Sequence, residues 1–96
     1  MYYASHFYML DDNNEYKEVT KIEIPSTITS IGKYQFSGFD NIAEIIIPSS
    51  VTSIGSYAFS NCTSLKIYCE SSYQPRGWNF YWNLSNCKVV WGYNSN

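Results

Sequence analysis

The feature that most constrains the fold of this chain is an internal repeat of 23 residues. Residues 22–44 read IEIPSTITSIGKYQFSGFDNIAE, and residues 45–67 read IIIPSSVTSIGSYAFSNCTSLKI. At an offset of 23, eleven positions are identical, and two further pairs keep their apolar character. A repeat of this length predicts a solenoid, because one unit cannot cover its own apolar face whereas stacked units can.

Each unit predicts two short strands and a tight turn. The Ile-x-Ile segments at 22–24 and 45–47 alternate and are β-branched, which predicts a strand that the following proline ends. A second strand is predicted before Gly32 and Gly55, where we expect a positive φ. The Tyr-x-Phe-Ser stretch that follows is too short for a long helix and predicts one helical or 3₁₀ turn.

Stacking would place equivalent residues of neighbouring units about 4.8 Å apart and build an apolar column. The predicted column pairs Ile22 with Ile45, Ile24 with Ile47, Ile31 with Ile54, and Phe36 with Phe59. Leu65-x-Ile67-x-Cys69 opens a third unit that is one residue shorter, and residues 88–91 predict a final strand.

Both ends of such a column need covers. At the N-terminal end, Phe7 to Val19 predicts a hairpin around the cluster Asp11, Asp12, Asn13, Asn14 and Glu15. The cluster lacks the spacing of a calcium loop, which favours a solvated turn over a cation site.

Three tryptophans mark the C-terminal end. Trp78 and Trp82 are four residues apart, which places them on one face of a helical turn, and Trp91 follows. We interpret them as a plug over the last unit, because the end of the apolar column would otherwise be exposed to water. A platform for stacking carbohydrate is the alternative.

Length and charge limit the class of protein. The chain has 96 residues, enough for one domain: an N-terminal hairpin cap over 1–18, repeats over 19–69 and a C-terminal cap over 70–96. Its net charge of −2 offers no basic field for nucleic acid, and its longest apolar run, Ile45 to Ile47, is far too short to enter a membrane. The first residues lack a signal peptide, so we expect an internal protein or a piece of a longer exported chain.

Catalytic and metal-binding patterns are missing from the sequence. His6 is the only histidine, and the three cysteines, Cys62, Cys69 and Cys87, form no Cys-x-x-Cys pair. No phosphate-binding glycine loop is present. We therefore expect no enzyme and no cofactor. The odd cysteine count favours buried free thiols, with a Cys69–Cys87 disulfide as the alternative in an oxidising compartment.

The second unit resembles the leucine-rich repeats of the bacterial surface antigen A (BspA-like) type. The matching segments are IAEIIIP at 42–48, VTSIG at 51–55 and AFSNC at 58–62, followed by Leu65. The first unit departs at Gln35 and Phe39, where the pattern has Ala and Cys. The resemblance implies a small, mostly β, right-handed leucine-rich-repeat solenoid with short helical turns, between the N-terminal hairpin and the Trp-rich C-terminal cap. Members are usually surface or secreted proteins associated with adhesion and with host or matrix proteins, and not with catalysis.

Repeat proteins bind through the outward residues of stacked strands. The predicted binding residues are Lys21, Glu23, Glu44, Ile46, Lys66 and Tyr68. Lys21 and Glu44 are equivalent positions and predict a cross-strand ion pair. Ile46 beside Tyr68 predicts an exposed apolar contact patch, against the alternative of ordinary apolar surface.

These observations favour a non-enzymatic module that recognises a protein ligand through its exposed strand face. One alternative is a structural or capping fragment of a longer surface protein, without a ligand of its own. Another is carbohydrate or cell-wall binding through the C-terminal tryptophans. An uncovered apolar sheet face would also make self-association possible.

Overall fold

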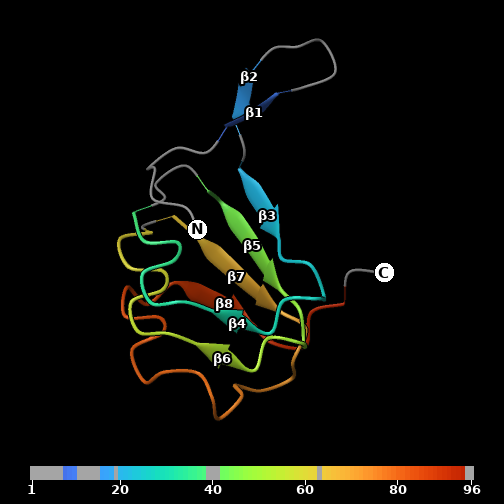
Figure 1. The fold of residues 1–96 in the computed structure, drawn as a ribbon, viewed down its shortest axis with the longest axis vertical. Coiled ribbons are helices and arrows are strands. Elements are labelled where there is room, and N and C mark those ends of the chain that lie inside the picture. Colours follow the sequence, from blue (N-terminus) through green and yellow to red (C-terminus); the bar gives the residue numbers. More distant parts are fainter. Residues whose placement is uncertain (1–7, 11–15, 19, 39–41, 63, 95–96) are drawn as a thin grey trace.

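The structure, a computed structural model, is a β-solenoid of about three turns (Figure 1). It describes residues 8–10, 16–18, 20–38, 42–62 and 64–94. These ranges contain eight short strands and no helix. A helix long and apolar enough to span a membrane is therefore also missing from the described ranges. The predicted mostly β solenoid is confirmed.

One side of the solenoid is a parallel sheet of four strands. In spatial order these are β3 (Lys21–Glu23), β5 (Glu44–Ile47), β7 (Lys66–Cys69) and β8 (Lys88–Val90). The predicted final strand is therefore confirmed, and it extends the same sheet. The register joins Ile22 to Ile45, Ile45 to Ile67, and Ile67 to Val89.

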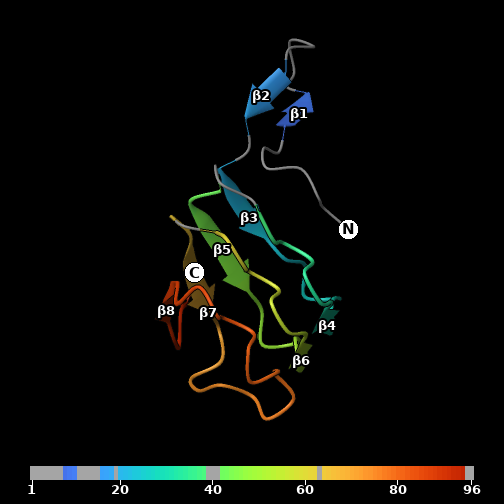
Figure 2. The ribbon, with the colours of Figure 1, turned by 90° about the vertical axis from the view of Figure 1, so that its left-hand side faces the viewer.

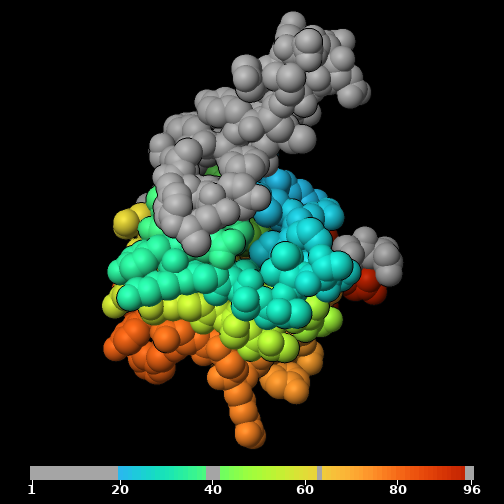
Figure 3. Space-filling model, viewed as in Figure 1, coloured from blue at the N-terminus to red at the C-terminus, as the bar shows by residue number. Residues whose placement is uncertain are grey.

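The opposite side carries a parallel pair, β4 (Ser30–Ile31) and β6 (Ser53–Ile54). A parallel bridge from Ile54 to Trp78 continues this ladder into the third turn. Figure 2 shows the two sheets facing each other across the solenoid. In the space-filling view, successive turns appear as coloured bands stacked from cyan to orange (Figure 3).

The N-terminal hairpin is also confirmed. β1 (Tyr8–Leu10) pairs antiparallel with β2 (Tyr16–Glu18), and Figure 1 shows this ribbon beyond the start of β3. The acidic cluster at 11–15 that the sequence singled out lies outside the described residues.

The core is the predicted column. Ile31, Ile45, Ile54 and Ile67 are buried, and the rings of Phe36 and Phe59 stack with their centroids 5.6 Å apart and their planes 4° from parallel. Spacings this short place each unit's side chains in van der Waals contact with the next unit. Stacking rather than any single unit therefore excludes water from the core.

The expected positive φ at Gly32 and Gly55 is wrong. The described glycines with positive φ are Gly38 and Gly92. Gly55 is needed for space: a Cβ there would lie 2.5 Å from the backbone nitrogen of Lys33 in the unit before. The close approach of two stacked backbones, and not the local turn, explains this glycine.

The expected helical turn after each glycine is also wrong. Tyr34 and Tyr57 both have φ of 59°, which breaks a right-handed helix at its first residues. Isolated turn bonds take the place of a helix, such as the one from the Ser37 amide to the Tyr34 carbonyl, at 3.1 Å. The neighbouring unit fixes this geometry, because the Tyr34 amide donates to the Ser56 carbonyl at 3.2 Å.

Candidate binding surface

The outward side chains of the four-stranded sheet form two straight rows, which we call the strand face. Strand side chains alternate, so each core isoleucine leaves its two neighbours pointing away from the core. The first row contains Lys21, Glu44, Lys66 and Lys88, and the second contains Glu23, Ile46, Tyr68 and Val90. The six residues named from the sequence therefore lie side by side. Their role in binding stays a prediction.

The charges of the strand face are arranged differently from the expectation. Lys21 and Glu44 are register partners, as predicted. The Lys21 ammonium, however, forms its ion pair with Glu23 of its own strand, at 3.8 Å. Glu44 accepts a hydrogen bond from the Tyr68 hydroxyl at 3.2 Å instead. The Tyr68 hydroxyl therefore takes the place of the Lys21 ammonium as the partner of Glu44. An exposed Lys21–Glu44 ion pair would have contributed little to stability.

Tyr68 is held in place on three sides. Besides its bond to Glu44, its ring lies 4.8 Å from the ring of Tyr93, and the Lys66 ammonium lies 5.2 Å from its centroid. A side chain fixed by a hydrogen bond, a ring contact and a cation loses little conformational freedom when a ligand binds. Tyr68 is therefore a pre-ordered centre of the strand face.

The expected exposure of Ile46 is wrong. Ile46 points to the outer side of the sheet, outside the core cluster, yet only 6% of its surface is exposed. It lies in an inner strand between Glu23 and Tyr68, and side chains on neighbouring strands shield an apolar residue between them. Ile46 and Tyr68 consequently do not form an exposed apolar patch.

The tryptophans close the third turn, which confirms the plug and leaves the rings of Trp78 and Trp82 unavailable as a carbohydrate platform. Trp78 and Trp82 are buried, and their rings contact edge to face at 4.7 Å, as the four-residue spacing predicted. Both indole N–H groups are satisfied inside the protein: Trp78 donates to the Val51 carbonyl at 3.1 Å, and Trp82 donates to Gln74 at 3.0 Å. Trp91 packs partly buried against them. Buried ring faces are not available to a sugar.

The three cysteines are buried and free, so Cys69 and Cys87 are not joined. Burial raises the pKa of the Cys69 thiol to about 12 and also raises the pKa of the Cys87 thiol. The Cys62 thiol donates to the Phe36 carbonyl at 3.0 Å. Protonated, enclosed thiols are poor nucleophiles, and these residues act as small core side chains.

Metal binding has no support in the described ranges, where no three His, Cys, Asp or Glu side chains gather in a group able to hold an ion. The acidic cluster at 11–15, the alternative calcium site, lies outside those ranges.

Sequence reasoning missed a second surface, a ladder of tyrosines at the turn that follows β4 and β6. The rings of Tyr34 and Tyr57 stack at 5.2 Å, and the rings of Tyr57 and Tyr81 stack at 5.9 Å. Tyr34 and Tyr81 are exposed, and Phe80 beside Tyr81 is 89% exposed. Identity of Tyr34 and Tyr57 in the repeat was the available signal. Tyr81 could not be recognised as the third member, because the Tyr-x-Phe-Ser motif of the first two units is absent around it.

The fold agrees with the comparison against known families. A family model described as "BspA type Leucine rich repeat region (6 copies)" matches residues 13–95, which include the whole described solenoid. No curated protein and no solved structure matches the chain. The match covers most of the sequence, and the chain belongs to the BspA-type leucine-rich-repeat family.

Proposed function

We propose that this chain is a non-enzymatic binding module of the adhesion type, which recognises a protein ligand through its strand face. The observation that carries the proposal is the parallel register of β3, β5, β7 and β8, which lines up charged and aromatic side chains in two rows. Leucine-rich repeats of this family are a non-enzymatic repeat often used for protein interaction, which supports the same role.

The chemistry of the strand face favours a ligand with acidic groups near its centre. Lys66 and Lys88 are neighbours in one row, and Tyr68 lies next to them. A fixed tyrosine offers a flat, partly apolar contact of the kind enriched at protein interfaces, and the two lysines beside it complement an acidic ligand in charge. Ile46 is not part of the proposed contact, because it is buried.

Family membership also supports a location at the cell surface or outside the cell. Such a location would bring the strand face into contact with matrix or host proteins. Protease treatment of intact cells, followed by detection of the chain, tests this part of the proposal: the chain should be cleaved while a cytosolic marker stays intact.

Binding is tested with purified matrix proteins presented one at a time to the immobilised chain. The variant carries Lys66→Glu and Lys88→Glu, which reverse two charges on the strand face. The matched control carries Lys33→Glu and Arg76→Glu, which make the same charge change on residues outside the sheet. Circular dichroism establishes that each variant is folded.

The proposal expects a matrix protein that binds the wild type and the control but binds the strand-face variant at least tenfold more weakly. Equal loss in both variants would show a response to net charge alone and would contradict the strand face. Failure of all the proteins to bind the wild type would favour the structural role, that of a fragment without its own ligand.

A further inference from the structure

The tyrosine ladder, formed by Tyr34, Tyr57 and Tyr81, holds three phenol rings in one stack on the surface of the solenoid. Tyr34 and Tyr57 have ring centroids 5.2 Å apart and ring planes 17° from parallel. Tyr57 and Tyr81 have centroids 5.9 Å apart and planes 7° from parallel. Each ring comes from a different turn, so Tyr57 lies between a ring of the turn before and a ring of the turn after.

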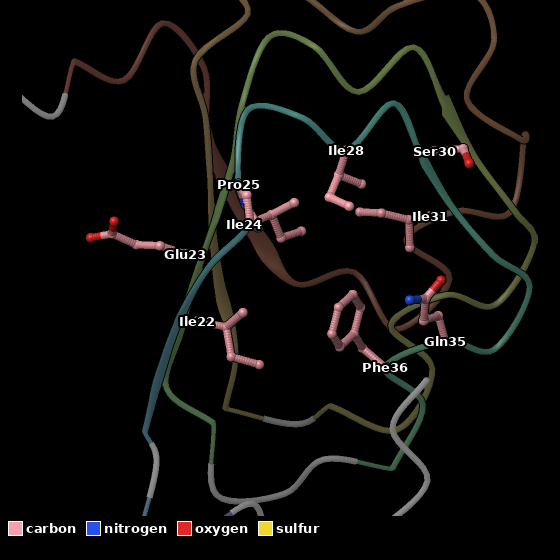
Figure 4. Close-up of a pocket in the computed structure, with 9 residues that line it drawn as sticks. All are labelled: Ile22, Glu23, Ile24, Pro25, Ile28, Ser30, Ile31, Gln35 and Phe36. Atoms are coloured by element: carbon pink, nitrogen blue, oxygen red, sulfur yellow. The ribbon is translucent and has the colours of Figure 1, made fainter. Parts of the chain in front are cut away.

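The backbone of the stacked turns keeps the ladder in register. Tyr34 and Tyr57 share a φ of 59°, so the two side chains leave the chain in the same way. The Tyr57 amide donates to the Tyr81 carbonyl at 3.0 Å, which holds the third tyrosine beside the second. Phe36, two residues after Tyr34, is instead directed inward, toward a cavity of about 290 Å³ that the first unit lines (Figure 4). The same turn therefore sends its phenylalanine to the core and its tyrosine to the surface.

Solvent reaches the ladder, whereas other easily oxidised side chains are enclosed. Tyr34 is 45% and Tyr81 46% exposed, and Tyr57 between them is partly exposed. The three thiols are buried, and so are Trp78 and Trp82. Because susceptibility to oxidation follows exposure as well as intrinsic reactivity, an oxidant outside the protein meets the phenols of the ladder before the buried thiols.

We propose that the tyrosine ladder is a site of oxidative cross-linking, where Tyr57 forms a carbon–carbon bond with Tyr34 or Tyr81 when hydrogen peroxide acts through a haem peroxidase. Each of two neighbouring phenols loses one electron and its hydroxyl proton and becomes a tyrosyl radical. The radicals join through ring carbons next to the oxygens, and each of these carbons passes its hydrogen through water to the oxygen, which restores both phenols. The two electrons and two protons removed reduce one hydrogen peroxide to two water molecules.

Stacking favours a bond within one chain over a bond between chains. A radical on Tyr57 already has a phenol on either side, and a reacting group held beside its partner is far more concentrated than a second molecule in dilute solution. The bond would join successive turns, which no disulfide joins because the three cysteines are free. Such a link restricts the unfolded chain and should raise stability. Cross-linking does not depend on the proposed ligand binding.

A second tyrosine pair of the same chain provides the comparison. The rings of Tyr68 and Tyr93 are closer, at 4.8 Å, but their planes are tilted by 52°. The hydroxyl of Tyr68 also donates to Glu44 at 3.2 Å, which fixes its ring. Parallel rings in register bring the carbons next to their oxygens opposite each other, and tilted rings do not. We therefore expect little coupling between Tyr68 and Tyr93.

Peptide mapping of the oxidised monomer tests the cross-link. The full chain in dilute solution is treated with hydrogen peroxide and a haem peroxidase, and the monomer is isolated. Trypsin cuts after lysine and arginine, so peptide 34–66 carries Tyr34 and Tyr57, and peptide 77–88 carries Tyr81. A Tyr57–Tyr81 bond joins the two peptides. A Tyr34–Tyr57 bond removes two hydrogens from the mass of peptide 34–66 and gives it dityrosine fluorescence.

The same map distinguishes the other links. A bond between Tyr68 and Tyr93 joins peptide 67–76 to peptide 89–96. Each of the two ladder peptides also contains a cysteine, so the thiols are reduced and alkylated before digestion, and only carbon–carbon bonds remain.

The proposal expects the links through Tyr57 to exceed the Tyr68–Tyr93 link by roughly tenfold. Tyr57→Phe keeps the stacked ring but removes the phenol, and it should abolish both links while circular dichroism stays unchanged. Tyr68→Phe makes the same chemical change in the comparison pair and should leave the links through Tyr57 intact. In concentrated urea, which removes the register, these links should fall by roughly tenfold.

Three results would overturn the proposal. Equal coupling at both tyrosine pairs would show that proximity alone is sufficient and that the stack has no special role. Dityrosine that forms mainly between chains, or as abundantly in urea as in the folded protein, would show that the ladder is not needed. Failure of the folded monomer to form any link through Tyr57 would contradict the proposal directly.

Discussion

Units one and two share eleven identical residues at equivalent positions of a 23-residue repeat, yet they occupy different environments. The second unit is packed on both sides: Phe59 stacks on Phe36 and also meets Trp82 edge to face at 6.2 Å. In the first unit, Ile28 is 38% exposed and lines a cavity, whereas its equivalent in the second unit, Val51, is fully buried. The difference teaches that a repeat motif specifies the shape of a unit, whereas its place in the stack decides how much each side chain contributes to stability.

The largest effect that would test this comparison is at the two phenylalanines. Phe59→Ala should cost about 3–5 kcal/mol, because it leaves a sealed cavity in the middle of the column. Phe36→Ala should cost less, roughly 2–3 kcal/mol, because the buried ring of Phe36 already lines a cavity of about 290 Å³ and has fewer packing contacts to lose. Urea denaturation at a fixed protein concentration measures both. Equal losses would show that position in the stack is unimportant.

The next largest effect concerns the C-terminal end of the apolar column, which the tryptophans cover. Trp82→Ala should cost about 3–5 kcal/mol and release the third turn, because Trp82 contacts Phe59, Trp78 and Trp91 together. Hydrogen exchange should then show lost protection in β8 while β5 keeps its protection. A uniform loss across all strands would mean that the turns unfold as one unit and cannot be separated in this way.

Exchanging the equivalent aliphatic residues sharpens the comparison. Val51→Ile copies the first unit's residue into the second, and we expect overpacking to cost about 1–3 kcal/mol, because Val51 is fully buried. The reverse change, Ile28→Val, should stay within about 0.5 kcal/mol. Thermal unfolding of the two variants gives the readout. If Ile28→Val lowered the stability strongly and Val51→Ile left it unchanged, the first unit rather than the second would be the more tightly packed, and the comparison would be wrong.

The smallest effect is a dependence of stability on alkaline pH through Cys69. Its pKa in the folded protein is about 12, against an ordinary 9.0, so the folded state holds its proton where the unfolded state has lost it. The contribution of Cys69 to stability is therefore constant below pH 9 and declines as the pH rises from 9 towards 12. A Cys69→Ala variant should show a shallower decline than the wild type over that window. Identical slopes would contradict the pKa assignment.

Much of the fold followed from the repeat. The strands around Ile22 and Ile45, the stacking of Phe36 on Phe59 and the hairpin at the N-terminus were all predictable from pattern and turn chemistry. The tryptophan plug was predictable too, because an apolar column has to end against something apolar. These features depend on properties that repeat along the chain, which a single sequence displays directly.

The third turn was harder to recognise. One signal was available: Asn61-Cys62 recurs as Asn86-Cys87, and both asparagines have positive φ, at 63° and 57°. Cys87 thereby enters the core at the end of the third turn, where its thiol donates to the Cys62 carbonyl at 3.3 Å. Changes of one or two residues in the spacing of this unit concealed the pattern, since a fixed offset no longer aligns it with the second unit.

The candidate binding surface was only partly predictable. The sequence specified which residues share the outer side of the sheet, because alternation and register are properties of the pattern. It did not specify that Ile46 would be shielded or that Tyr68 would bond to Glu44, because both depend on side chains brought from other strands. Burial on an outer sheet face is decided by neighbours across strands.

The sequence by itself determined the unit of this protein: its length, its two strands, its inward isoleucines and its membership of a repeat family. The tertiary structure alone decided the backbone conformation at the glycines and tyrosines. Gly55 is required because the backbone at Lys33 passes close to it, and Tyr57 is held at positive φ while its amide donates to the Tyr81 carbonyl at 3.0 Å. Local preference would place positive φ at the glycine, but contacts between stacked units outweigh a preference of about 1 kcal/mol per residue.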